Sequence, residues 1–280
     1  MNKSKYCEFF KDKVMIITGA SSGIGLASAK LFASLGAKLV LAARSDDKLR
    51  AIASEISSDP DSNILCVKTD VSVESDCEAL INKAVEKFGG IDILVNNAGL
   101  SMRAMFRDLD LSVIKTLMDV NFWGTVYCTK YALPYLLASR GSVVGVISIA
   151  GFAGLPARTG YASSKYAIRG FLDTLRIEHL YDGLHVMVFA PGFTASNVRN
   201  AALTADGHQQ GKTPRDEGKM MSAEKVAEYM ARGLVKRKSE MVLTPIGKLT
   251  VLLHNLFPRL TDKLEFSYMA KEPDSPFHKK

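Results

Sequence analysis

The feature that most restricts the fold of this chain is a repeated alternation of short apolar runs with longer segments of helical periodicity. Short apolar runs are typical of strands buried in a parallel sheet, and the helices between them carry the chain back to the same edge. The strand-like runs lie at 14–18, 38–42, 64–68, 91–95, 142–147, 185–189 and 240–243. The helical segments lie near 24–34, 46–57, 74–88, 111–139, 162–181 and 223–236. The pattern predicts an α/β fold, a single Rossmann-like doubly wound domain whose seven-stranded parallel sheet is flanked by helices on both faces.

The rhythm of the pattern also predicts the boundaries along the chain. We assign residues 1–11 to a flexible N-terminus, 12–245 to the nucleotide-binding and catalytic domain, and 246–280 to a C-terminal amphipathic helix and tail. Residues 193–220 are polar and poor in periodicity, and long loops of this kind are usually functional or disordered. We interpret them as a substrate loop, with surface disorder as the alternative. The apolar stripe at 246–260 is typical of a core or subunit interface, and peripheral membrane contact is the less common alternative.

Charge and cysteine content exclude several classes of protein. The chain carries 36 Lys and Arg against 29 Asp and Glu, but the excess is spread out and forms no basic stripe with interleaved aromatics. We therefore expect no nucleic-acid partner. The four cysteines lack C-x-x-C spacing and a His cluster, which argues against a metal site or a disulfide framework and favours a reducing, cytoplasmic location. We find neither a signal peptide nor a transmembrane segment.

A glycine-rich turn follows the first predicted strand and opens the next helix. Glycine is required where backbone approaches a pyrophosphate, and a helix N-terminus offers free N–H groups to an anion. The spacing is G-x-x-x-G-x-G instead of the commoner G-x-G-x-x-G, and an ordinary tight turn is the alternative. Its position directly after the first strand favours phosphate binding. The candidate contacts are Gly19, Ser21, Ser22, Gly23, Ile24 and Gly25.

The end of the second strand indicates which dinucleotide binds. NAD enzymes usually place a carboxylate there for the ribose 2′-OH, whereas this chain has Arg44 and Ser45. A guanidinium can bind a 2′-phosphate, so we predict NADP(H) as the cofactor. The alternative is a surface arginine that begins a loop. Asp46 follows closely and is better explained as a cap of the next helix.

Tyr161 and Lys165 stand four residues apart in a helical segment, on one helix face. A cation beside a phenol favours the phenolate and lowers its pKa, so the pair can exchange a proton near neutral pH. Ser148 lies at the end of the fifth predicted strand and can polarise a carbonyl oxygen. A Tyr and a Lys at this spacing are common on exposed helices, so the pair gains meaning only from the other motifs.

Together these residues resemble the short-chain dehydrogenase/reductase family of the Tyr-x-x-x-Lys type. The motifs fall in family order over residues 12–243: T-G-A-S-S-G-I-G at 18–25, Asp70-Val71, Asn96-Asn97-Ala98-Gly99, Asn121, Ser148, Tyr161 with Lys165, and Pro191-Gly192. The tail resembles the C-terminal extension of membrane- and lipid-associated reductases of this family, such as the dehydrogenase/reductase member 7-like proteins.

The resemblance implies a role for each matching residue. Asn121 would bend a helix and hold a water in a proton relay, and Lys165 would also hydrogen-bond the nicotinamide ribose. Plainer alternatives remain: Asp70 as a helix cap, Asn97-Ala98-Gly99 as a turn and Pro191-Gly192 as a strand terminator. The cofactor contacts implied are Asp70 and Val71 at the adenine, Asn97, Ala98 and Gly99 along the cofactor, and Pro191, Gly192, Phe193 and Thr194 around the nicotinamide.

We therefore predict an NADP-dependent oxidoreductase, a carbonyl reductase that acts on a moderately hydrophobic ketone, aldehyde or secondary alcohol, with a lipid or steroid-like skeleton as one option. Tyr161 would be the general acid/base, and Met102, Phe152, Pro156 and Phe193 are candidate walls of the substrate site. The alternatives are an NAD-linked alcohol dehydrogenase and a non-catalytic NADP-binding sensor or scaffold. The family resemblance implies a homodimer or homotetramer.

Overall fold

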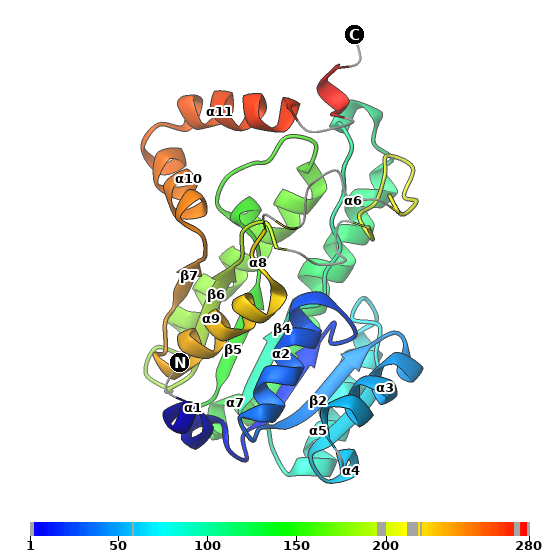
Figure 1. The fold of residues 1–280 in the computed structure, drawn as a ribbon, viewed down its shortest axis with the longest axis vertical. Coiled ribbons are helices and arrows are strands. Elements are labelled where there is room, and N and C mark those ends of the chain that lie inside the picture. The colour runs from blue at the N-terminus through cyan, green and yellow to red at the C-terminus, as the bar shows by residue number, and fades with distance from the viewer. Residues whose placement is uncertain are drawn as a thin grey trace.

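A single parallel sheet forms the centre of the molecule (Figure 1). The computed structural model describes residues 3–57, 59–194, 200–211, 218, 220–271 and 275–278. The strands have the order β3-β2-β1-β4-β5-β6-β7, so the direction of winding reverses between β1 and β4. Their bounds are β1 Val14–Thr18, β2 Lys38–Ala43, β3 Ile64–Lys68, β4 Ile93–Asn96, β5 Ser142–Val146, β6 His185–Ala190 and β7 Glu240–Val242. In folds of this kind ligands bind at the carboxyl ends of the strands beside that reversal.

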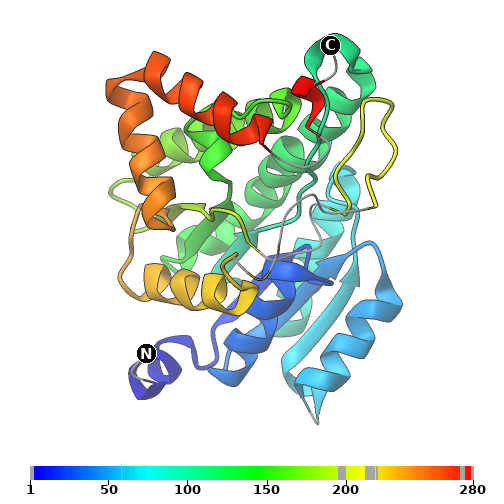
Figure 2. The ribbon, with the colours of Figure 1, turned by 45° about the horizontal axis from the view of Figure 1, so that its top comes forward.

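Two helical layers cover the sheet (Figures 1 and 2). Alternate strand residues point to opposite faces, so Met15 and Ile17 join one apolar cluster and Ile16 joins the other. The first layer contains α1 Lys3–Phe10, α2 Gly23–Ser34, α3 Asp46–Ile56 and α9 Ala223–Val235. The second contains α5 Glu74–Phe88, α7 Gly124–Ala138 and α8 Thr159–Glu178. The predicted fold class is therefore confirmed.

The N-terminal segment differs from the expectation of a flexible end. Residues 3–10 form α1, in which Tyr6 and Phe10 are buried and the Phe10 ring lies 4.9 Å from that of Phe32. The domain therefore begins before residue 12.

The long helix expected at 111–139 is interrupted. It consists of α6 Leu111–Leu117, a π-helical turn η2 at Met118–Trp123, and α7. A π-turn inserts a residue into the helical ladder and occurs often at functional sites. Asn121 lies in this turn and is fully buried.

The tail contains two helices where the sequence pattern predicted one. α10 spans Pro245–Leu256 and α11 spans Pro258–Ala270, because Pro258 cannot continue the hydrogen bonding of the preceding helix. Both helices lie at one end of the molecule, above α8 in Figure 1. Among the helices of the described residues, none is long and apolar enough to span a bilayer. Shorter elements are α4 Pro60–Asn63 and the 3-10 turns η1 Phe106–Asp108, η3 Ile149–Gly151 and η5 Pro276–His278.

Candidate active site

The glycine turn after β1 is packed too closely for any side chain. A Cβ on Gly25 would lie 2.3 Å from the carbonyl oxygen of Gly19, and a Cβ on Gly19 would lie 2.9 Å from Ala98 Cα. Gly19 also has a φ of +66°, which favours glycine. Ser22 precedes α2 and makes no side-chain capping hydrogen bond, so the first N–H groups of this helix can bind an anion. The turn therefore fits the pyrophosphate of a dinucleotide.

The segment after β4 is bonded to this turn. The Asn97 amide donates to the carbonyl oxygens of Thr18 at 2.9 Å and Gly19 at 3.3 Å. The hydroxyl of Thr18 accepts from the backbone N–H groups of Asn97 and Ala98, both at 3.0 Å. These four bonds join the carboxyl ends of β1 and β4, the two strands where the winding reverses.

The carboxyl end of β2 carries the predicted selectivity residues. Arg44 and Ser45 are exposed and directly follow the strand, and Arg44 makes no ion pair with any residue that the structure describes. Asp46 begins α3, and its carboxylate accepts from Arg50 Nε at 2.6 Å. The carboxylate nearest to Arg44 in sequence is thus engaged within its own helix.

Asp70 and Val71 both have structural partners. The Asp70 carboxylate accepts from the backbone and hydroxyl of Ser72, at 3.0 and 2.7 Å, which forms a local turn. Val71 is buried against α7, where a Cβ on Gly124 would lie 2.9 Å from its side chain. The local turn matches the plainer explanation of Asp70, and nothing here tests a contact with adenine.

The structure brings Ser148, Tyr161 and Lys165 together. α8 begins at Thr159, three residues earlier than predicted, so Tyr161 lies in its first turn. Ser148 lies close enough to the Tyr161 phenol to lower its pKa. The Lys165 ammonium lies 5.8 Å from the centre of the Tyr161 ring and donates to the Val146 carbonyl oxygen at 2.9 Å.

Burial dominates the titration of this group of residues. It raises the pKa of the Tyr161 phenol above its usual value, while the hydrogen bond from Ser148 and the positive charge of Arg158 act in the opposite direction. Burial also lowers the pKa of Lys165 to about 8. The expectation that a nearby cation would leave Tyr161 with a lowered pKa therefore differs from the structure, in which desolvation is the larger effect.

Asn121 braces the loop beside these residues. Its side-chain oxygen accepts from the Leu100 N–H at 2.8 Å, and its amide donates to the Leu100 carbonyl at 3.0 Å and to the Ser164 hydroxyl at 2.8 Å. Ser164 donates in turn to the Tyr161 carbonyl oxygen. Asn121 thereby connects the segment after β4 with the first turn of α8, and its π-turn is the bend that the resemblance implied.

Part of the predicted nicotinamide segment follows β6. Gly192 lies against Thr244, because a Cβ there would be 3.0 Å from the Thr244 side chain. Thr194 is buried and pairs with Met221, whereas Phe193 is 40% exposed. Of the predicted substrate loop 193–220, residues 195–199, 212–217 and 219 lie outside the described residues.

Comparison with known proteins identifies the family. The family model for short chain dehydrogenases matches residues 13–206, well over half of the chain. This chain belongs to the short-chain dehydrogenase family. It is therefore an oxidoreductase with a nicotinamide cofactor.

Individual members of the family extend the match over nearly the whole chain. A dehydrogenase/reductase SDR family protein 7-like of Dictyostelium discoideum is 35% identical, over 93% of this chain and 83% of its own length. This confirms the resemblance of the chain to dehydrogenase/reductase member 7-like proteins.

Two solved structures support the fold. An alcohol dehydrogenase from Thermococcus sibiricus, in complex with 5-hydroxy-NADP, is 28% identical with a TM-score of 0.74 and covers 83% of this chain and 96% of its own. A short-chain dehydrogenase/reductase from Burkholderia phymatum, in complex with NAD, has a TM-score of 0.80 at 24% identity and covers 90% and 95%. The two complexes differ in cofactor, so the comparison leaves the choice between NAD and NADP open.

Three residues that contribute to this site were not predicted from the family motifs. The Thr18 hydroxyl accepts a hydrogen bond from the Asn97 N–H, and the Ser164 hydroxyl donates one to the Tyr161 carbonyl oxygen. The positive charge of Arg158 lowers the pKa of the Tyr161 phenol. Thr18 lies inside the quoted motif, and the other two lie three residues on either side of Tyr161. Helical spacing from Tyr161 was therefore a signal that could have found Ser164.

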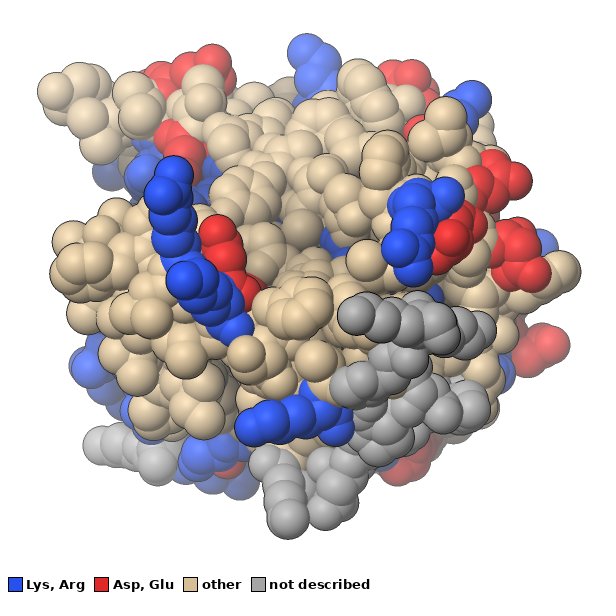
Figure 3. All heavy atoms as spheres, turned by 90° about the horizontal axis from the view of Figure 1, so that it is seen from above, with Lys and Arg blue, Asp and Glu red and all other residues tan. Residues whose placement is uncertain are grey.

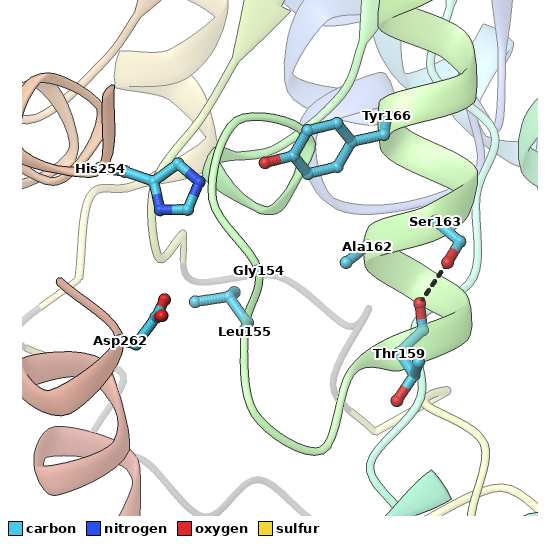
Figure 4. A pocket seen from close by; sticks show the side chains of 8 residues that line it. All are labelled: Gly154, Leu155, Thr159, Ala162, Ser163, Tyr166, His254 and Asp262. Carbon is cyan, nitrogen blue, oxygen red and sulfur yellow. Dashed lines mark hydrogen bonds between the residues drawn. The ribbon is translucent and has the colours of Figure 1, made fainter. Parts of the chain in front are cut away.

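A cavity of about 520 Å³ lies on the outer side of α8 (Figure 4). α8 contributes Thr159, Ala162, Ser163 and Tyr166, the loop before it contributes Gly154 and Leu155, and His254 and Asp262 come from α10 and α11. Ser148, Tyr161 and Lys165 do not line it. α8 thus separates this cavity from the predicted catalytic residues.

The candidate substrate walls fall in different places. Met102 is buried in the cluster against which Tyr161 packs, which is consistent with a position near the reaction centre. Phe152 is buried in the core beneath α8, with the Arg169 guanidinium 3.9 Å from the centre of its ring. Phe152 is therefore core, and its assignment as a substrate wall was wrong.

Proposed function

We propose that this short-chain dehydrogenase transfers a hydride between NADP(H) and the carbonyl or secondary alcohol of a moderately hydrophobic molecule, with Tyr161 as general acid/base. The observation that carries the proposal is the grouping of Ser148 with Tyr161 and with the Lys165 ammonium, which lies 5.8 Å from the centre of the Tyr161 ring. No residue of the Asn121, Ser148, Tyr161 and Lys165 set is replaced, which argues against a non-catalytic sensor or scaffold.

The protein's own groups would perform the proton chemistry. The bound cofactor supplies the hydride, or accepts it in the reverse direction. Ser148 donates a hydrogen bond to the substrate oxygen and stabilises the charge that develops there. Tyr161 gives its proton to that oxygen, and Lys165 stabilises the resulting phenolate. The hydrogen bonds of Asn121 hold α8 next to the segment after β4.

Replacement of Tyr161 by phenylalanine tests this assignment. Tyr161→Phe removes the proton donor and keeps the ring, so we expect NADPH affinity to be retained while turnover of a panel of ketones and aldehydes falls by about 100-fold or more. Tyr166→Phe is the matched control, since this second tyrosine faces the cavity on the other side of α8. Near wild-type turnover in Tyr161→Phe would show that the proton comes from elsewhere.

The choice of NADP(H) rests on Arg44. An exposed guanidinium without an ion-pair partner in the described part of the chain, at the end of β2, suits a 2′-phosphate, and no carboxylate stands there to prefer NADH. Arg44→Gln should weaken NADPH binding about 10- to 100-fold and leave NADH binding unchanged. Lys48→Gln, an exposed control on α3, removes the same charge without that effect. Equal affinity of the wild type for NADH would favour the NAD-linked alternative.

A moderately hydrophobic substrate suits the surface around the site. The end of the molecule that carries α10 and α11 is hollowed near its centre, and mostly uncharged side chains surround the hollow (Figure 3). Tyr161 packs against an apolar cluster that includes Met102, Leu117 and Leu203. Carbonyl substrates with an apolar skeleton should therefore be preferred over small polar ones in the same panel.

We also propose that the segment 246–260 contacts a membrane surface. Ile246, Leu249 and Leu256 are 78%, 53% and 61% exposed, while His254 faces the internal cavity, so α10 turns its apolar side outward. Lys248 and two further basic residues, Arg259 and Lys263, lie among them and suit anionic lipid. The protein should float with phosphatidylserine vesicles, and Leu249→Asp with Leu256→Asp should abolish this. Equal flotation of the double variant would refute the contact.

The oligomeric state and the cytoplasmic location stay predictions. The end of α8 exposes Ile177, and the turn that follows it exposes Leu180 and Tyr181, which supports association through this end of the helix, as the family resemblance implies. Light scattering after gel filtration should give a dimer or tetramer. Ile177→Arg should shift the mass to that of the monomer.

A further inference from the structure

Two basic residues flank Tyr161 along the chain, Lys165 one turn later in α8 and Arg158 at the N-cap of this helix. Lys165 is directed toward the sheet: its Nζ donates to the Val146 carbonyl and would lie 3.4 Å from a Cβ on Gly99. Lys165 therefore lies between β5 and the segment after β4, where the cofactor motifs converge. Arg158 approaches from the start of α8.

The Arg158 backbone is fixed from both sides. Its N–H donates to the Leu155 carbonyl at 3.1 Å, and its carbonyl accepts from the Ala162 N–H at 2.8 Å. The preceding residue, Ala157, is buried and has a φ of +58°, a conformation that costs a non-glycine residue about 1 kcal/mol or more. A strained and buried turn thus sets the direction in which Arg158 leaves the helix.

The Arg158 guanidinium lies at the edge of the cluster that holds Tyr161. Its Nη1 donates to the Ala157 carbonyl at 3.4 Å, and this same carbonyl accepts from the Ala104 N–H at 3.2 Å. Ala104 and Met102 belong to the apolar cluster against which the Tyr161 ring packs. A positive charge at the border of an apolar cluster acts more strongly than one in water, because the surroundings screen it less.

We infer that Arg158 is a positioning residue for the catalytic proton: its guanidinium stabilises the phenolate that remains when Tyr161 has given its proton to the substrate oxygen. The inference rests on the proposed role of Tyr161. The proton leaves the phenol and the phenol becomes an anion, so the step needs a cation and no other reactant. Burial disfavours that anion and raises the pKa of Tyr161. The positive charge of Arg158 favours the anion and lowers this pKa.

Other charged groups on the elements around Tyr161 bear on its titration. Lys165 comes from α8 itself, and Arg103 comes from the segment after β4. Lys115 lies on the exposed side of α6, and Asp206 is exposed beside the 200–205 segment, with its carboxylate bonded to Thr204. Variants must therefore change Arg158 alone, and the measurement must report on Tyr161 alone.

A titration of the Tyr161 phenol in Arg158 variants reports on Tyr161 alone and needs neither substrate nor cofactor. The difference in ultraviolet absorbance between the protein and its Tyr161→Phe variant isolates ionisation of Tyr161. In the Arg158→Gln background we expect the pKa of this phenol to rise by about one unit, the size expected for a partly screened charge within about 10 Å. Arg158→Lys should preserve most of the wild-type value. Arg107→Gln, an exposed arginine on η1, should preserve all of it.

Kinetic measurements then distinguish a failure of the Arg158 inference from a failure of the proposed role of Tyr161. The pH at which kcat for the oxidation direction is half-maximal should rise with the phenol pKa in Arg158→Gln and be restored in Arg158→Lys, while KM for NADP changes little. An unchanged titration in Arg158→Gln, with turnover still dependent on Tyr161, overturns the inference alone. Turnover independent of Tyr161 overturns the proposed function and the inference with it. Circular dichroism through the titration confirms that each variant remains folded.

Discussion

The buried ammonium of Lys165 lowers the free energy of unfolding of this protein. Lys165 is 4% exposed, and burial lowers its pKa from the usual 10.5 to about 8. At about 1.4 kcal/mol per unit, the ammonium destabilises the folded protein by about 3 kcal/mol at pH 7, which is below both values. As pH rises from about 8 to 10.5, the folded protein loses this proton before the unfolded chain does. Stability therefore increases over that window.

Lys165→Met makes the effect measurable. Methionine fills a similar volume without a charge, and its main cost is the loss of the bond to the Val146 carbonyl, about 1 to 2 kcal/mol. At pH 7 we expect the variant to be about 1 to 2 kcal/mol more stable than the wild type in urea unfolding without cofactor, and to lose turnover. At pH 9.5 only about 1.4 kcal/mol of the charge penalty remains, so the advantage should vanish.

The comparison between pH values contains its own control. All other titrations are common to both proteins and cancel in the difference, and Lys130→Met, at an exposed position on α7, should show no dependence on pH. A difference between wild type and Lys165→Met that stays constant from pH 7 to 9.5 would refute the reasoning. A variant less stable than the wild type at pH 7 would mean that the Val146 bond outweighs the burial of charge.

Two further predictions concern the cofactor turn and the N-terminus. Gly25→Ala should weaken NADPH binding at least tenfold in a fluorescence titration, because the new Cβ would lie 2.3 Å from the Gly19 carbonyl oxygen; Gly170→Ala, where a Cβ meets nothing within 4 Å, is the control, and equal affinities would contradict the fit. Phe10→Ala should lower the free energy of unfolding by about 3 to 5 kcal/mol, because the ring is fully buried against Phe32; a loss below about 1 kcal/mol would mean that α1 is not docked in solution.

Elements whose pattern is local were predictable from the sequence. β1 and β3 match their predicted bounds, and α5 does as well, because continuous apolar runs and period-3.6 apolar patterns carry their own signal. The glycine turn was predictable for the same reason: steric demands at Gly19 and Gly25 restrict the residue type directly.

Elements that depend on distant partners were not predictable. One example is α1, a short helix that is stabilised only because Tyr6 and Phe10 pack into the first layer. The π-turn at Asn121 depends on bonds to Leu100 and Ser164, 21 and 43 residues away in sequence. The effect of Arg158 on Tyr161 follows from the turn that precedes α8, and no periodicity encodes it.

The C-terminal helices are joined to the site by a tight set of contacts at the start of α10. A Cβ on Gly247 would lie 2.5 Å from Ile149 Cδ1, and a Cβ on Gly192 would lie 3.0 Å from Thr244 and 3.5 Å from the same Ile149 atom. Ile149 directly follows Ser148, and Gly192 belongs to the predicted nicotinamide segment. The Ile149 side chain therefore packs directly on the backbone of both glycines, and it lies between α10 and the loop after β6. These contacts connect the start of α10 with the residue next to Ser148.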